Sequence, residues 1–509
     1  MDPSRSPHEN KHVLPPGPRG MPLLGNLVRF RRDQLGFLLR LQRTYGRMAT
    51  ILIGKTTVVL LFRPEHVRYV LTDNPRNFTN REVAGGLIFG NLLVLSLLAR
   101  SLTEKATRGL HDFVGDGLLT TDGEFHDRHR RLLQGALARR RVEQHAGLIV
   151  RYTQEAVERW RGGTEMDLAH EMQAVILRIT AKILFDQDVR DSALGSIIDA
   201  VLAQPVGLFE GLLNLRVALP FTPYRRRMAL LRQADAVIYA VIDRRRAENR
   251  DVGDVLSILL QSGTETTVDA LTRREVRDEL VSLLAAGHET TTNTLAWTFY
   301  LLARNPAVLG HLISEIQQVL GGRDPRVSDM VNLRYLDWVV KESMRLYPSA
   351  WTQGRQAIAA FDLDGYHFPA GTFLMFSQWV LHRLPDVWGD PDVFRPERWD
   401  PAHGEKAQRW AYFPFGDGPR SCLGMPLANL EVRLVLVTIL QRLIPILVPG
   451  HPVEPFPLIT LRPKHGLWIR FKPASTVVPA PVTGASDPSP ISACPYQERL
   501  TTGREMGFG

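Results

Sequence analysis

Cys422, one of only two cysteines in this 509-residue chain, lies in the sequence Phe-Gly-Asp-Gly-Pro-Arg-Ser-Cys-Leu-Gly at positions 415–424. Directly after it, Pro426 opens a run of apolar residues at helical spacing, and proline suits the first turn of a helix. We therefore predict that Cys422 lies at a helix N-terminus, where the helix dipole favours an anionic sulfur. A single cysteine is most often a small buried hydrophobe. The residues around this one instead favour an anionic thiolate.

The other residues of this loop suit a bound heme. Gly418 and Gly424, like Gly416, can adopt positive φ and let the backbone approach a flat cofactor closely. Arg420 carries a permanently charged fork that could pair with a heme propionate, and backbone N–H groups of the loop could point at the sulfur. The pattern Phe-x-x-Gly-x-Arg-x-Cys-x-Gly, which starts at Phe415, resembles the heme-binding loop of the cytochrome P-450 (heme-thiolate monooxygenase) family.

A long helix is predicted ahead of this loop. Thr272 and Glu275 form a capping-box signature, and helical patterning then continues to Arg304, where Asn305-Pro306 ends it. At 1.5 Å per residue this helix would be about 50 Å long, enough to cross a whole domain. Glycine and clustered threonines weaken its middle, so we expect a local bulge there.

The middle of this helix carries an Ala-Gly-His-Glu-Thr-Thr motif. A lone Ala-Gly pair more often marks a close helix crossing. Together with the cysteine loop, however, the motif resembles the family's oxygen-activating segment. That resemblance implies that Ala286 and Gly287 form the bulge that holds O2 and that Thr290 hydrogen-bonds the oxygen at the iron. Glu289 would relay protons toward it, whereas His288 is interpreted as an ordinary helix residue.

Two further segments resemble conserved structural parts of the family. Glu342 and Arg345 are one helical turn apart, and such pairs are usually surface salt bridges. Here Pro-Glu-Arg-Trp follows at 396–399. The segments resemble the family's Glu-x-x-Arg helix and its downstream Pro-Glu-Arg-Phe, with Trp399 in place of the usual Phe. The resemblance implies a structural cluster in which Arg398 joins the first two residues and supports the heme.

Three more basic residues are candidates for binding the heme propionates. The stretch 122–131 resembles the start of a helix where many family members carry Trp-x-x-x-Arg, and here it contains His126 and Arg130. Their spacing places them on one helix face, where both could contact a propionate; the alternative is a basic surface turn. Arg355, which follows the Glu-x-x-Arg helix, is the third candidate.

The resemblance covers roughly residues 15–472. It implies a single large domain that is mainly α-helical with small β-sheets (α+β), with the long helix lying over the heme. Residues 1–14 form a polar lead, and residues 473–509 form a proline- and serine-rich tail that is predicted to be disordered. Short β-like runs are predicted at 48–53 and 57–62, and mixed extended segments at 356–375 and 458–471.

Composition and charge fit an ordinary globular protein, with 44% hydrophobic residues, 23% charged residues and a formal net charge of +9. Basic clusters such as 139–141 are usually solvated helix faces, and the alternative is that they steer an acidic electron donor. No motif supports nucleic-acid binding. Cys422 and Cys494 cannot form a disulfide framework, which points to a reducing compartment, so we expect a cytoplasmic protein.

We expect no transmembrane anchor, because no run reaches the roughly 20 apolar residues that a membrane-spanning helix needs. The nearest case is the apolar segment 85–99, which is too short and contains Asn91. This segment is expected to be buried or to form a lip over an apolar pocket, with peripheral membrane contact as the alternative. Substrate contacts are expected from segments whose apolarity favours a lipophilic substrate, namely 85–118, 201–221, the Ala286 turn and 349–353.

The predicted enzyme is a monooxygenase that binds heme b through the Cys422 thiolate, activates O2, and hydroxylates or epoxidises a lipophilic small molecule. Fatty acid, terpenoid, steroid and polyketide substrates remain open. No dinucleotide-binding fingerprint is present, so electrons are expected from a separate ferredoxin or flavodoxin with its reductase. One alternative is a peroxygenase or peroxide isomerase, against which the Glu289-Thr290 pair argues. The other is a non-catalytic heme-based ligand binder or sensor.

Overall fold

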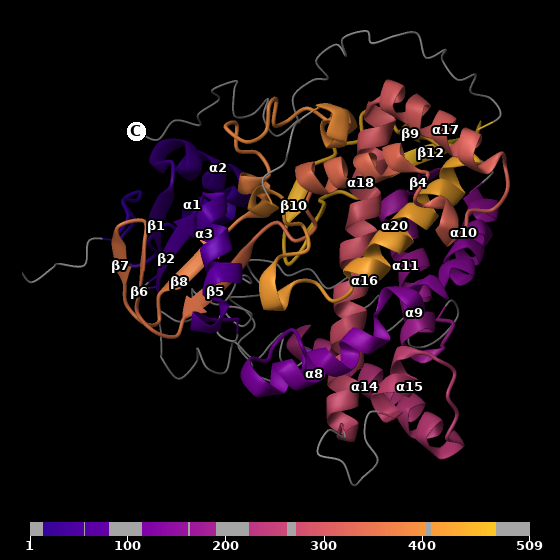
Figure 1. The fold of residues 1–509 in the computed structure, drawn as a ribbon, viewed down its shortest axis with the longest axis horizontal. Helices are drawn as coiled ribbons and strands as arrows, with labels where there is room; N and C mark the ends of the chain where they lie inside the picture. The colour runs from indigo at the N-terminus through magenta and orange to yellow at the C-terminus, as the bar shows by residue number, and fades with distance from the viewer. Residues whose placement is uncertain are drawn as a thin grey trace, which may run out of the picture.

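The computed structural model describes residues 14–54, 56–80, 114–160, 163–189, 223–261, 271–403 and 409–474. Four segments with sequence-based predictions lie outside them: the polar lead up to residue 13, the apolar segment 85–99, the pocket segment 201–221, and the tail from 475 with Cys494. A helical body and a smaller lobe of strands and short helices make up the described part (Figure 1). The predicted fold class, mainly α with small sheets, is confirmed.

Helices make up most of the body, and a few short ones flank the strands of the small lobe (Figure 1). Within the described residues no helix is both long and apolar enough to span a bilayer. The α-helices are α1 Leu27–Arg32, α2 Gln34–Tyr45, α3 Pro64–Arg68, α8 Gly123–Ala136, α9 Arg139–Glu143, α10 Ala146–Trp160, α11 Leu168–Phe185, α14 Pro223–Glu248, α15 Val255–Gln261, α16 Arg273–Arg304, α17 Pro306–Leu320, α18 Arg334–Leu346, α19 Gln378–Leu381 and α20 Met425–Leu440.

The largest sheet belongs to the small lobe and has the strand order β1-β2-β8-β5-β3. β1 and β2 are antiparallel, whereas β2 and β8 are parallel. The strands predicted at 48–53 and 57–62 are confirmed, the second shifted by one residue. The strands are β1 Met48–Ile53, β2 Thr56–Leu61, β3 Phe78–Thr79, β4 Glu165–Asp167, β5 Gln353–Ala357, β6 Phe361–Leu363, β7 Tyr366–Phe368, β8 Phe373–Phe376, β9 Leu443–Leu447, β10 Pro455–Pro457, β11 Leu461–Pro463 and β12 Trp468–Pro473.

α16 runs through the helical body and packs against α11, α18 and α20 (Figure 1). The predicted capping box is present: the Thr272 side chain accepts from the Glu275 N–H, and the Glu275 carboxylate accepts from the Thr272 N–H. The helix ends at Arg304, so its prediction from sequence is confirmed at both ends. Trp297 and Phe299 are fully buried, which shows that this end of α16 is part of the core.

The bulge expected at Ala286-Gly287 is absent, because α16 is α-helical throughout. The Thr290 hydroxyl donates to the Ala286 carbonyl at 2.7 Å and so adds to the helix hydrogen bonds without breaking them. A Cβ at Gly287 would lie 3.6 Å from Thr180 Cγ2 of α11, in ordinary van der Waals contact. The glycine therefore lies where α16 and α11 pack together.

The predicted cluster of Glu342, Arg345 and Arg398 is present and fully buried. Arg345 donates to both Glu342 oxygens at 2.8 and 2.9 Å, and Arg398 Nε donates to Oε1 at 2.8 Å. The Trp399 indole N–H donates to Oε2 at 3.0 Å, so the unusual tryptophan takes part in the cluster. Burial alone would raise the pKa of Glu342, but the two arginines outweigh it and hold the pKa below its usual value.

We expect Arg398→Met to lower the free energy of unfolding by about 3–5 kcal/mol, because it leaves the buried Glu342 charge short of a partner. A matched control is Arg139→Met, which removes an exposed ion pair to Glu143 and should change that free energy by less than about 1 kcal/mol. Urea unfolding followed by circular dichroism measures both variants. Equal effects of the two substitutions would contradict the structural role of the cluster.

Candidate functional site

Cys422 lies just before α20, as predicted, with Gly424 as the residue that caps the helix and Pro426 in its first turn. The loop is closed by a hydrogen bond from the Cys422 N–H to the Phe415 carbonyl at 2.8 Å. Cys422 is surrounded by many protein atoms, yet its side chain remains accessible to solvent. The sequence therefore folds into a tight loop that presents the sulfur at a helix N-terminus.

The loop glycines play different parts. Gly418 has φ +71, and a Cβ there would lie 1.8 Å from the Leu71 carbonyl oxygen, so only glycine fits. Gly416 also has positive φ. The expectation of positive φ at Gly424 is wrong, because its φ is −79 as it enters α20. A Cβ at Gly424 would lie 3.9 Å from the Cys422 sulfur, which is ordinary contact.

The protein groups alone do not stabilise a thiolate at Cys422. Burial raises the pKa of its thiol, and this outweighs the lowering by the backbone N–H groups of Gly424 and Met425 and by the charge of Arg130. The helix N-terminus acts in the expected direction, because the N–H groups of Gly424 and Met425 lower the pKa, but burial is the larger effect. A metal ion bound at the sulfur would supply the missing positive charge, since a coordinating thiol is deprotonated outright.

Basic residues from α8 and β5 surround this loop. Arg130 of α8 donates to the Ser421 hydroxyl at 3.3 Å. His126, one turn earlier, is buried, and burial followed by the charge of Arg420 lowers its pKa. Arg355 of β5 is also buried, and burial together with the charge of Arg420 lowers its pKa to about 10. The predicted propionate-binding residues are thus brought together.

Arg420 itself contacts Asp122 and the Thr121 carbonyl, the latter at 2.7 Å. Asp122 precedes α8 but makes no capping hydrogen bond, because its carboxylate is turned toward Arg420 and the Asn80 N–H. Within the described residues, Arg130 and Arg355 have no ion-pair partner within 4 Å. Two buried or half-buried cations next to an accessible cysteine fit a cofactor that carries two carboxylates and a metal, as heme does.

The other predicted residues lie along α16. Thr460, from the turn before β11, donates to Glu289 Oε1 at 2.6 Å and accepts from Asn293 Nδ2 at 3.0 Å. The Ser349 hydroxyl donates to the Thr290 carbonyl at 2.9 Å. Thr460 and Asn293 were missed by the sequence analysis, since a contact across 171 residues leaves no local pattern.

His288 is a core residue, as interpreted from sequence. Its Nε2 lies 3.2 Å from the Gln173 carbonyl oxygen, and burial lowers its pKa to about 4, so the ring is neutral at pH 7. Near His288, the side chain of Glu431 on α20 lies beside Thr291 of α16. Burial raises the pKa of Glu431 to about 8. The helix that follows Cys422 thus packs against the helix that carries Glu289 and Thr290 (Figure 1).

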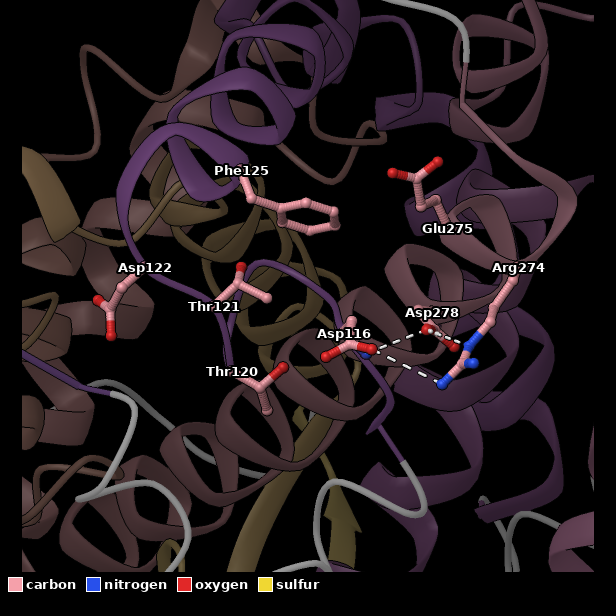
Figure 2. A pocket seen from close by; sticks show the side chains of 8 residues that line it. All are labelled: Asp116, Thr120, Thr121, Asp122, Phe125, Arg274, Glu275 and Asp278. Atoms are coloured by element: carbon pink, nitrogen blue, oxygen red, sulfur yellow. Dashed lines mark hydrogen bonds and ion pairs between the residues drawn. The ribbon is translucent and has the colours of Figure 1, made fainter.

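A cavity of about 360 Å³ lies between the start of α8 and the start of α16. Figure 2 shows Asp116 and Asp278 facing Arg274 on one side of the cavity. Asp122 lies on the other side, beyond Thr120 and Thr121. The lining of the cavity is Asp116, Thr120, Thr121, Asp122, Phe125, Arg274, Glu275 and Asp278. This acidic, polar cavity does not match the apolar pocket expected for substrate and includes neither Cys422 nor the Glu289-Thr290 pair.

Comparison with known proteins identifies the family of this chain. The cytochrome P450 family model matches residues 15–88 and 97–469. Cyclooctat-9-en-7-ol 5-monooxygenase of Streptomyces melanosporofaciens is 32% identical over 446 residues, covering 86% of this chain and 91% of the relative. Pentalenene oxygenase of Streptomyces avermitilis is 30% identical over 466 residues, covering 91% and 98%.

A similar fold is found in the solved structure of retinoic acid-bound cyanobacterial CYP120A1, with a TM-score of 0.76, 24% identity, and coverage of 91% of this chain and all of that one. The four motifs that resemble the family in sequence lie on elements that contact one another. Arg130 of α8 hydrogen-bonds the cysteine loop, and α16, which carries Glu289, packs against α18, which carries Glu342, and against α20, which follows Cys422. The chain therefore belongs to the cytochrome P450 family and is an oxidoreductase of the monooxygenase type.

Proposed function

We propose that this protein binds heme b through Cys422 and uses O2 to hydroxylate or epoxidise a lipophilic small molecule, with electrons from a separate ferredoxin or flavodoxin and its reductase. The observation that carries this proposal is the accessible Cys422 sulfur next to cations that lack ion-pair partners among the described residues. A thiolate-ligated heme supplies the oxygen-activating chemistry, because electron donation from the sulfur favours O–O cleavage.

The basic residues around the loop would hold the two heme carboxylates. Arg355 is buried on β5, and Arg130 and His126 project from one face of α8. Arg420 is already paired with Asp122 and therefore contributes less free charge than the sequence suggested. Because Gly418 has no side chain, the backbone of the cysteine loop can pack directly against the backbone of Leu71.

Glu289 and Thr290 would handle protons on the α16 side. The Thr290 hydroxyl donates its hydrogen bond to the Ala286 carbonyl, so the Thr290 Oγ1 atom can act toward other groups only as an acceptor. Thr460 holds the Glu289 carboxyl by donating to Oε1, and Asn293 fixes the Thr460 hydroxyl in turn. The carboxyl is therefore oriented while it remains half-buried, which suits a residue that exchanges protons with solvent.

A terpenoid is the substrate class that we propose. Two relatives, each similar over nearly its whole length, have names that specify an alkenol and an alkene, cyclooctat-9-en-7-ol and pentalenene. Such compounds offer few polar groups, so their recognition depends on apolar surface. Apolar pocket residues were expected from the sequence in segments that include 349–353, where Ser349 contacts α16.

The carbon monoxide difference spectrum of the dithionite-reduced protein should show a strongly red-shifted Soret band that is lost in Cys422→Ser. Serine cannot supply the electron donation of a thiolate. Cys494→Ser is the matched control, since it removes the other cysteine and should leave the band in place. A band that survives Cys422→Ser, or the absence of any heme band in the wild-type protein, would overturn the assignment.

Thr460→Val should lower coupled product formation by about tenfold, because the Glu289 carboxyl loses the hydroxyl that orients it. Glu289→Gln should lower it by about a hundredfold. Thr460→Ser keeps the hydroxyl and should restore most of the activity. The measurement is product and hydrogen peroxide formed per NADPH with surrogate redox partners and a terpene that shifts the Soret band. Unchanged coupling in Thr460→Val would show that this contact plays no part.

A further inference from the structure

An exposed apolar patch lies in the small lobe. Its members, here called the exposed apolar patch, are Met21 at 48%, Leu23 at 75%, Val28 at 47% and Leu52 at 42% exposure. They come from the turn before α1, from α1 itself and from the end of β1. Figure 1 shows α1 and β1 in the small lobe, apart from α10 and α17 at the far side of the helical body.

Hydrogen bonds hold the segments of this patch together. Asn26 is buried, its side-chain amide donates to the Arg19 carbonyl at 3.3 Å, and its Oδ1 accepts from the Leu52 N–H at 2.9 Å. Gly25 has φ +59, and a Cβ there would lie 2.3 Å from the Leu52 carbonyl oxygen, so the turn and β1 touch through glycine. The apolar side chains are therefore presented by a fixed surface.

Leu23 is the most exposed member of the patch, and both its backbone conformation and its exposure are unfavourable for folding. Its φ is +64, in the left-handed region that bulky side chains rarely adopt, and its side chain is the most exposed large apolar one among the described residues. Glycine would relieve the backbone strain and remove the exposed apolar surface at once. Such a residue indicates a function that the folded chain alone does not reveal.

Positive charge surrounds the patch. Residues 14–32 contain no Asp or Glu and four arginines, Arg19, Arg29, Arg31 and Arg32. On α1, Arg29 and Arg32 share the exposed face with Val28, whereas Leu27 and Phe30 are buried on the opposite face. The first carboxylate after this run, Asp33, is engaged by the Gly36 N–H and Arg40.

We propose that the exposed apolar patch docks on an anionic lipid bilayer, with Leu23 inserted at the level of the lipid headgroups and the arginines bound to lipid phosphates. A few projecting apolar side chains within a basic surface is the arrangement by which proteins bind a membrane surface without spanning it. Four apolar side chains are a small part of what a stable protein interface needs, since such an interface takes about 20–30 residues a side. A bilayer needs only shallow insertion.

The test measures cosedimentation of the full-length protein with vesicles of phosphatidylcholine alone and of phosphatidylcholine with 30% phosphatidylglycerol. The wild-type protein should bind the anionic vesicles and lose binding at high salt. Leu23→Gly should bind at least about tenfold more weakly, since a buried leucine is lost. This variant should fold well, because glycine adopts φ +64 without strain. Arg29→Gln should weaken binding about fivefold.

Val331→Gly is the matched control, because Val331 is exposed to 74%, almost as much as Leu23, and lies in a turn outside the patch. It should bind like the wild-type protein. The proposal is overturned if wild-type protein does not bind anionic vesicles, or if Leu23→Gly and Val331→Gly behave alike. It is also overturned if sedimentation velocity shows a dimer that Leu23→Gly dissociates, since the patch would then join two copies of this chain.

Discussion

The region around Cys422 depends on positive charge that the described residues do not neutralise. Arg130 and Arg355 lack ion-pair partners there, and burial lowers the pKa of both. Unpaired charge in a poorly solvated position opposes folding. The Cys422 sulfur has the opposite need, since burial raises the pKa of its thiol and leaves it neutral without a further cation. One ligand with two carboxylates and a metal ion meets both needs, so heme binding and folding should be strongly coupled.

The buried Glu342 cluster contrasts with this region because its charges are satisfied within the protein, and it connects to the loop through hydrogen bonds. Arg345 donates to the His382 carbonyl at 2.8 Å, and His382 Nε2 accepts from the Phe413 N–H at 3.1 Å. Burial and the charge of Arg345 lower the pKa of His382 to about 3, so the ring stays neutral and able to accept. The Phe413 carbonyl then accepts from the Gly416 N–H at 3.0 Å, inside the cysteine loop. The cluster thus fixes the backbone that positions Cys422.

Features set by local pattern could be predicted from sequence, and features set by distant contacts could not. The capping box at Thr272 and the strand at 48–53 follow from short-range rules and agree with the structure. The pairing of Arg420 with Asp122 and the contact of Thr460 with Glu289 join residues roughly 300 and 170 positions apart, and no periodicity reports them. Gly424 does not have the positive φ that glycine allows, because it directly precedes α20. Glycine accepts positive and negative φ about equally, so its presence alone does not predict the sign.

The composition of α16 indicates that one residue in its middle, Glu289, does more than pack the core. From residue 280 to 304 the only carboxylate is Glu289, in a stretch that is otherwise largely buried and apolar. Thr290, Thr294 and Thr298 donate their hydroxyls to backbone carbonyls of the same helix, so these three do not need this acid. A carboxylate in such a position is unfavourable for folding unless it is held, and Thr460 holds it from another element. Local sequence rules are most often broken at functional sites, which makes Glu289 the residue of α16 whose presence the fold alone does not account for.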